Sequence, residues 1–270
     1  MKITIEAGRS ESHYWKDLWR YRELFYFLAW RDLLVRYKQT VIGVAWAVLR
    51  PLLTMLALTL VFGKLAKLPS DGVPYPILVF AALLPWHFFA SSFSEAGNSL
   101  INNSNMISKV YFPRLVIPIS AVASAFVDFC ASFLVLIAMM LFFRVAPTWA
   151  VLSLPLWLLL AAATALGVGL WLASLAVKYH DVALALNFGI EIWKYLTPVA
   201  YSITLIPEQW RWLYSLNPMT QVVEGFRWAL LGTSQPPNWT TVVSSALVLV
   251  LLVTGAFYFR RTERTIVDVF

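Results

Sequence analysis

The sequence is poor in charged residues and in cysteine. Only 13% of its 270 residues are charged, whereas 60% are hydrophobic, and soluble domains average about 25% charged and 45–50% apolar residues. Its one cysteine excludes a disulfide scaffold, and its apolar content excludes an intrinsically disordered chain. Because the polar residues are too few to cover a water-soluble globule, we expect a polytopic membrane protein.

Motifs for nucleotide binding, metal binding and hydrolysis are also missing from the sequence. The one Gly-Lys pair, residues 63–64, is followed by Leu65 and lacks the remainder of a P-loop. No H-E-x-x-H or G-x-S-x-G motif occurs, and His13, His87 and His180 are far apart in the chain. We therefore expect no metal, no cofactor and no enzymatic activity in this chain, so that any ATP and Mg²⁺ would bind a separate protein.

Long apolar runs are abundant. A run of 23 residues makes a helix of about 34 Å, enough to cross a hydrocarbon core of about 30 Å. The sequence therefore predicts an all-α membrane domain, residues 1–270, with six transmembrane helices. The six predicted spans are residues 41–63, 75–94, 115–143, 150–177, 182–204 and 240–259.

Basic residues are distributed unevenly between the predicted loops, and the net charge is +7. With both termini on the inside, the inside segments carry 14 Lys and Arg residues and the outside segments carry 5. Such an excess marks the cytoplasmic side of a membrane protein. We therefore expect cytoplasmic termini and contacts with anionic membrane lipids, and no nucleic-acid partner.

Two further segments are amphipathic but too polar to cross a membrane. In residues 14–38, Leu18, Tyr21, Phe25 and Leu28 recur at helical spacing among charged residues. Charged side chains of such a helix reach water while its apolar face is buried. We therefore predict a helix that lies in the cytoplasmic interface.

The second amphipathic segment follows the fifth predicted span. Asn217 is suited to cap a helix at its N-terminus, Pro218 to open it and Gly232 to end it. We predict that residues 205–232 form a pair of short re-entrant helices on the outer side, the second lying at the outer leaflet with Arg227 turned away from its apolar stripe. That stripe consists of Met219, Val222, Val223, Phe226 and Leu230.

Four ionisable residues lie inside predicted spans, where a charge is costly unless it finds a partner. Asp128 is in the third span, Arg50 is in the first, and Glu191 and Lys194 are three residues apart in the fifth. At this spacing, Glu191 and Lys194 can neutralise each other. Two roles stay open for the four charges, namely internal pairing that fixes helix packing, or the lining of a polar pathway.

Aromatic residues make up 16% of the chain, with 13 tryptophans. Many of them are expected in the belts at the membrane interfaces. Others lie within or at the ends of the first, second and fifth spans, and aromatic faces stack on the C–H faces of sugars, so these residues are candidates for lining a carbohydrate pathway. The candidates are Trp46, Trp86, Phe88, Phe89, Trp193, Tyr195 and Tyr201.

Three motifs, in this order and spacing, resemble the transmembrane subunit of ABC-2 type polysaccharide exporters, the family of O-antigen, capsule and teichoic-acid permeases. The first is R-Y-K-Q-T-V-I-G-V-A-W at residues 36–46, with R-P-L at residues 50–52. The second is V-Y-F-P-R at residues 110–114. The third is L-N-P-M-T at residues 216–220, which continues to E-G-F-R at residues 224–227.

This resemblance implies a homodimer that binds two copies of a cytoplasmic ABC ATPase and exports a lipid-linked glycan across the bacterial inner membrane. It implies that residues 14–38 act as a gate helix, with Arg31, Asp32, Arg36 and Tyr37 as its functional residues. It also implies that residues 102–114 form a coupling loop that docks on the ATPase. The coupling residues would be Asn105, Met106, Ile107, Lys109, Val110, Tyr111 and Arg114.

Three alternatives stay open at this point. A transporter of the same fold would export a drug or a simple lipid, and its genetic neighbourhood would distinguish it. An intramembrane enzyme acting on lipid-linked sugars would depend on Asp128 or His87 and would work without an ATPase. A proton-coupled secondary transporter would use Glu191 or Asp128, and its transport would follow the proton gradient.

Overall fold

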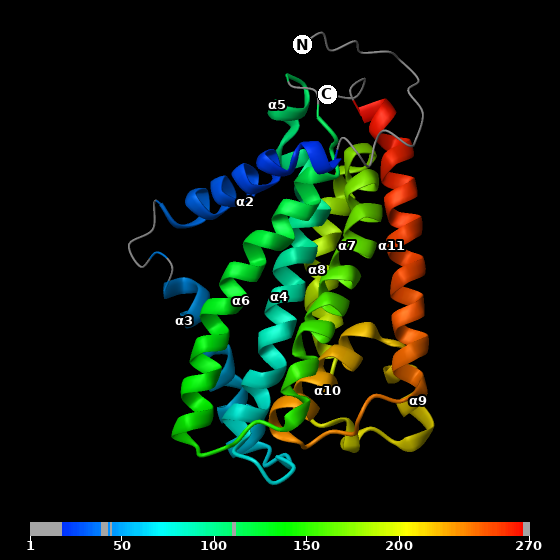
Figure 1. Cartoon of the computed structure of the whole chain (residues 1–270). Coiled ribbons are helices and arrows are strands. Elements are labelled where there is room, and N and C mark those ends of the chain that lie inside the picture. Colours follow the sequence, from blue (N-terminus) through cyan, green and yellow to red (C-terminus); the bar gives the residue numbers. More distant parts are fainter. Residues whose placement is uncertain (1–17, 39–42, 44, 110–111, 267–270) are drawn as a thin grey trace.

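The protein is a bundle of long helices (Figure 1). The computed structural model describes residues 18–38, 43, 45–109 and 112–266, and these residues contain no strand. Five helices in this part of the chain are long and apolar enough to cross a membrane. They are α3 (Ala45–Leu58, continued by a π-helix, Thr59–Leu65), α4 (Tyr75–Asn102), α6 (Val116–Phe142), α7 (Leu154–Lys178, preceded by a 3₁₀-helix, Trp149–Ser153) and α11 (Trp239–Ile266).

The prediction of a sixth crossing at residues 182–204 is not confirmed. Helix α8 (His180–Tyr195) has 16 residues, which makes it about 24 Å long. The chain then turns at Thr197 and Pro198 and enters a short 3₁₀-helix, Ile203–Leu205. Proline has no N–H and disfavours helical backbone in the residue before it, so α8 ends at this point.

Helix α4 forms the centre of the bundle (Figure 1). Of its 28 residues, 19 are buried, whereas only 10 of the 27 residues of α6 are buried. It packs against α3, α6, α7, α8 and the shorter α10. A helix that is apolar on all sides is best placed where protein surrounds it, and this explains the central position of α4.

Helices α7 and α11 approach each other closely at two glycines. A Cβ atom added to Gly255 would lie 2.5 Å from the carbonyl oxygen of Gly167, and one added to Gly167 would lie 3.0 Å from the backbone nitrogen of Leu252. Small residues at membrane helix interfaces allow backbones to come this near and gain dispersion contacts. The two glycines therefore fix how α11 joins the bundle.

Helices α2 (Arg22–Tyr37) and α5 (Ser104–Ile107) lie at one end of the bundle, called here the α5 end (Figure 1). Helix α2 crosses this end and packs on α6. The apolar face predicted for it is confirmed, because Leu28 is buried and Leu18, Tyr21 and Phe25 pack against the same hydrophobic cluster. Its location at a membrane surface stays a prediction.

Helices α9 (Glu208–Leu216) and α10 (Pro218–Leu231) lie at the opposite end (Figure 1). The predicted capping is confirmed, since Asn217 Oδ1 accepts a 3.0 Å hydrogen bond from the backbone N–H of Met219 and Gly232 is left-handed with φ 67°. The predicted apolar stripe is buried. Helix α10 packs against α4 and α7, and its depth relative to the outer leaflet stays a prediction. A re-entrant role for the pair stays a prediction.

The close approach of α7 and α11 predicts that Gly255→Ala destabilises the protein by about 1–3 kcal/mol, because backbone atoms must move to admit the methyl group. Thermal unfolding of the purified protein in detergent measures the change. Gly189→Ala is the matched control, because a Cβ at Gly189 meets nothing within 4 Å. Equal melting temperatures for the two variants would contradict the role assigned to this contact.

Candidate functional site

A cavity of about 510 Å³ lies between the end of α2 and helices α3, α4 and α6. Its lining is unusual for a membrane protein because four charged side chains reach it, together with an imidazole and four aromatic rings. The charged residues are Arg36, Arg50, Glu95 and Asp128, and the others are His87, Tyr37, Trp46, Phe88 and Phe129. Such a combination of convergent polar groups and apolar walls is typical of a ligand site.

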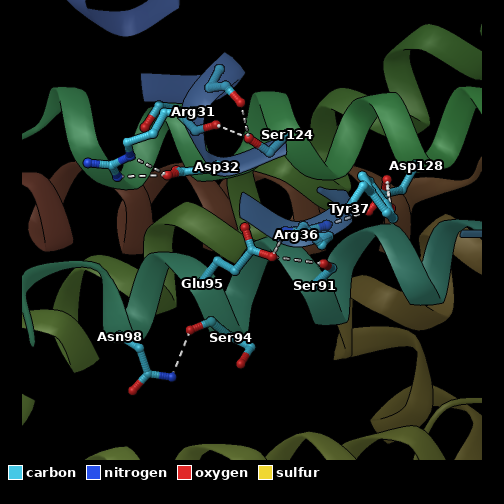
Figure 2. A network of polar contacts seen from close by, with 12 residues as sticks. Arg31, Asp32, Arg36, Tyr37, Ser91, Ser94, Glu95, Asn98, Ser124 and Asp128 are labelled. Carbon is cyan, nitrogen blue, oxygen red and sulfur yellow. Dashed lines mark hydrogen bonds and ion pairs between the residues drawn. The ribbon is translucent and has the colours of Figure 1, made fainter. Parts of the chain in front are cut away.

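Arg36 bridges three helices at this cavity (Figure 2). Its guanidinium, at the end of α2, forms ion pairs with Glu95 of α4 and with Asp128 of α6. Tyr37 donates a second hydrogen bond to Asp128. These four residues, called here the Arg36 cluster, attach the end of α2 to the bundle. Arg36 and Tyr37 were predicted as gate residues and Asp128 as an intramembrane charge, and the structure brings the three together.

The phenol of Tyr37 acts as a hydrogen-bond donor in this cluster. Burial, assisted by the hydrogen bond to Asp128, raises the pKa of Tyr37 to about 12. Because the phenol keeps its proton at neutral pH, it can stabilise the ionised form of the Asp128 carboxylate.

Small polar residues of α6 add further contacts to the neighbouring helices. Ser124 donates a 3.1 Å hydrogen bond to the backbone carbonyl of Ala29 in α2, and Ser132 donates a 2.9 Å bond to that of Ala47 in α3. Hydrogen bonds of this kind are worth about 1 kcal/mol or less between membrane helices. They support the position of α2 and α3 around the cavity.

A second attachment of α2 starts from Arg31, in the middle of the helix, and reaches the α5 region. Arg31 donates a 2.7 Å hydrogen bond to Asn103 Oδ1, and the same guanidinium contacts the sulfur of Met106. Asp32 holds that guanidinium through 2.7 Å and 3.0 Å contacts (Figure 2). Helix α2 is thus attached to α5 through Arg31 and to the cavity through Arg36.

The predicted coupling residues divide into exposed and buried groups. Asn105 and Lys109 are exposed, and Met106 is half-buried. Ile107 is only 5% exposed and packs in the cluster beneath α5, so its side chain is not available at the surface to contact an ATPase. Arg114 is also buried, and its backbone N–H donates a 3.0 Å hydrogen bond to Glu263 of α11. Val110 and Tyr111 lie outside the described residues.

The predicted pathway aromatics are also separated by the fold. Trp46 and Phe88 line the cavity, whereas Trp86 and Phe89 are buried in the hydrophobic core. Trp193 packs edge-on against Phe89 with 4.9 Å between ring centroids. The remaining two candidates lie elsewhere, with Tyr195 exposed and Tyr201 donating a 3.1 Å hydrogen bond to the carbonyl of Tyr195.

The charges expected on the fifth span pair with each other, as their spacing predicts. Lys194 and Glu191 form an ion pair on α8, and the Glu191 side chain is 62% exposed. Both charges, together with Arg50 of α3, lie near enough to His87 of α4 to act on it electrostatically. Ionisable groups of three helices, α3, α4 and α8, thus lie near one another.

Arg227 lies in a different environment from the one predicted for it. Arg227 of α10 is 1% exposed, although it was predicted to face away from the apolar stripe. It donates hydrogen bonds of 3.1 Å and 3.0 Å to the carbonyls of Val199 and Tyr201, and it pairs with Glu224 at 3.1 Å. Arg227 thus satisfies backbone carbonyls of the non-helical segment that follows α8.

Comparisons with known proteins agree with this architecture. Residues 23–231 match the ABC-2 type transporter family, and the chain belongs to this family of membrane transport proteins. An O-antigen export system permease protein, RfbA, of Myxococcus xanthus is 27% identical over 254 residues, which cover 92% of this chain and 96% of the relative.

Two further relatives are also transport proteins by name. An O-antigen export system permease protein of Klebsiella pneumoniae is 29% identical over 199 residues, 73% of this chain and 76% of the relative. The polysialic acid transport protein KpsM of Escherichia coli is 23% identical over 248 residues, 86% of this chain and 91% of the relative.

The Arg36 cluster generates a stability prediction. Arg36→Gln leaves two carboxylates near each other without a counterion, and we expect it to lower the free energy of unfolding by about 1–3 kcal/mol. The side chains are 22–31% exposed, so water screens part of the repulsion and keeps the effect below that of a fully buried pair. Thermal unfolding in detergent measures it.

The matched control neutralises all three charges in the variant Arg36→Gln, Glu95→Gln, Asp128→Asn. We expect this triple variant to recover most of the lost stability, because neutral amides can hydrogen-bond with one another. A triple variant less stable than Arg36→Gln would show that the carboxylates do not depend on Arg36.

Proposed function

We propose that this chain is the permease subunit of an ATP-driven exporter that moves a lipid-linked polysaccharide across the bacterial inner membrane. In this proposal two copies of the chain form the pathway, and two copies of a separate cytoplasmic ABC ATPase supply the energy. The observation that carries the mechanism is the double attachment of α2, which links the surface near α5 to a charged cavity among the transmembrane helices. The similarity to O-antigen and polysialic acid export proteins supports the substrate class.

The exposed residues near α5 are the proposed docking surface for the ATPase. Asn105, Ser108 and Lys109 are exposed there, while Ile107 anchors α5 to the hydrophobic cluster beneath it. Arg114 ties the start of α6 to Glu263 of α11. Because α5 is exposed at its surface and anchored by Ile107 at its base, a force that the ATPase exerts on α5 would be transmitted to the helices beneath it.

Force applied at α5 has a defined route to the cavity in this proposal. Asn103 sits at the junction of α4 and α5, and its side chain accepts the hydrogen bond from Arg31. Arg36 lies five residues further along the same helix and contacts Glu95 and Asp128. A displacement of α5 would thus move α2 and change the ion pairs that close one wall of the cavity.

Exposed polar groups on α3 and α8 support a pathway between two copies of the chain. A carboxylate facing hydrocarbon costs several kcal/mol, and yet the Glu191 side chain is 62% exposed on α8. Arg50 is exposed on α3, with the apolar side chains of Leu53 and Leu56 also uncovered on that helix. A second copy would cover the apolar surface, and an aqueous path would solvate the charges.

The docking proposal is tested by charge reversal at the α5 surface. We expect Lys109→Glu combined with Asn105→Asp to abolish co-purification with the partner ABC ATPase and to reduce glycan export at least tenfold. Co-purification and surface glycan are measured in the same cells. Lys67→Glu is the control and should change neither, because this exposed residue precedes the first residue of α4 whereas α5 follows the last. Retained binding and export in the α5 variant would overturn the docking assignment.

The route through α2 is tested separately by removing the bond between Arg31 and Asn103. We expect Asn103→Leu to leave the ATPase bound, because the exposed docking residues are unchanged, and to lower export about fivefold. ATPase activity per exported glycan should rise, since hydrolysis would continue with weaker coupling. An unchanged ratio of hydrolysis to export would show that α2 does not carry the force.

A further inference from the structure

Arg50 lines the cavity without a direct partner among the residues that the structure describes. Arg36 pairs with both carboxylates of the cavity, Glu95 and Asp128, so neither carboxylate is bonded to Arg50. Among the described residues, the Arg50 guanidinium has no hydrogen-bond or ion-pair partner, although it lines the same cavity. A guanidinium held within a membrane domain favours an anionic partner, so the site is incomplete as it stands.

A second unsatisfied group lies beside Arg50. The Nε2 atom of His87 on α4 is buried and, within the described residues, has no hydrogen-bond partner. His87 lines the cavity and lies within electrostatic range of Arg50. Buried polar atoms are normally hydrogen-bonded, and an unpaired one at a cavity wall indicates a missing ligand atom.

The two groups share one chemical requirement. A guanidinium has donors only, and an imidazole nitrogen that carries a proton is a donor as well. A ligand that presents acceptor oxygens therefore satisfies Arg50 together with the tautomer of His87 that carries its proton on Nε2, and the planar donor fork of arginine fits phosphate and carboxylate oxygens. A cavity of about 510 Å³ also holds more than a free carboxylate, with Trp46 and Phe88 as an apolar wall for the remainder of the molecule.

We propose that Arg50 and His87 bind a phosphate-class oxyanion carried by a molecule that enters the cavity from the membrane. The identity of the molecule that bears the phosphate rests on the proposed function, since in a lipid-linked polysaccharide a phosphate ester joins the glycan to the lipid. Binding of the phosphate by Arg50 and His87 does not itself depend on transport. The carboxylates stay on the Arg36 side of the cavity, where Arg36, Tyr37 and Ser91 hold them, so the oxyanion meets the Arg50 side.

Protection of an engineered cysteine tests this site without an ATPase. Cys130 is the sole cysteine and is exposed outside the cavity lining, so Cys130→Ala with Ser91→Cys places one thiol in the cavity. The full chain is reconstituted in phosphatidylcholine nanodiscs, and the rate of maleimide modification is measured. One arm adds phosphatidic acid to the nanodisc, and the other adds inorganic phosphate to the buffer.

We expect phosphatidic acid to slow modification of Ser91→Cys about fivefold. Protection by phosphatidic acid alone assigns the site to a lipid-borne phosphate, and protection by both probes assigns it to phosphate from either source. Absence of protection in both arms would overturn the proposal. The unaltered Cys130 thiol, measured in parallel, corrects for any effect of phosphatidic acid on the reagent.

Two variants identify the residues responsible. Arg50→Gln should abolish the protection, and Arg50→Lys should retain part of it because the charge remains. Lys178→Gln, which removes an exposed basic residue at the α5 end, should leave it unchanged. Equal protection in Arg50→Gln and the parent would also overturn the proposal. The protection assay contains no ATPase, so its result does not depend on ATPase docking or on export. Failure of the proposed function and failure of the phosphate site are therefore distinguishable.

Discussion

Helices within a bilayer gain little from the hydrophobic effect when they associate, so close packing and a few polar contacts must hold them together. Helix α4 meets this constraint by being surrounded, with α3, α6, α7, α8 and α10 all packed on it. Close backbone approach at Gly167 and Gly255 then fixes α11 against α7. Helix α2 instead lies across the end of the bundle and exposes one face. Its attachment combines the apolar packing around Leu28 with polar bonds, and polar bonds can be exchanged at low cost.

This combination explains how one chain can be rigid in its core and responsive at one end. Besides its apolar packing, α2 forms two ion pairs and several hydrogen bonds to α4, α6 and the α5 region. Each is partly exposed, and partly exposed ion pairs contribute little more than about 1 kcal/mol. In the proposed mechanism, binding of the ATPase near α5 would supply enough free energy to rearrange such bonds without disturbing the packing of α4. The proposed mechanism follows from this separation of strong packing and weak polar attachment.

The long apolar runs predicted five of the helices, although α4 and α11 continue eight and seven residues beyond the predicted ends. Asn217 and Gly232 predicted the bounds of α10, because apolar length and capping are local signals. The partners of Arg36 are not local, since Asp128 is 92 residues away in the sequence. Glu95 was missed because the second span was expected to end at residue 94, whereas α4 continues to Asn102. Trp86 and Phe88 were indistinguishable in a helix that is apolar all round. Both are buried in the core, and only packing brings Phe88 to the cavity as well.

The sequence left two roles open for charges within the spans, and the structure indicates that the roles are divided among them. Asp128 is paired across helices, and so is Arg227 with backbone carbonyls, which is the arrangement expected of charges that fix packing. Arg50 has no ion-pair partner in the part of the chain that the structure describes, and Glu191 is exposed although it pairs with Lys194 on its own helix. Since protein groups leave these charges open to their surroundings, water, a second copy or a ligand must stabilise them. They lie on α3 and α8 around the same residue of α4, His87. In the proposed function, a polar substrate would therefore move along the side of the bundle that bears these charges, where its transfer from water costs the least free energy.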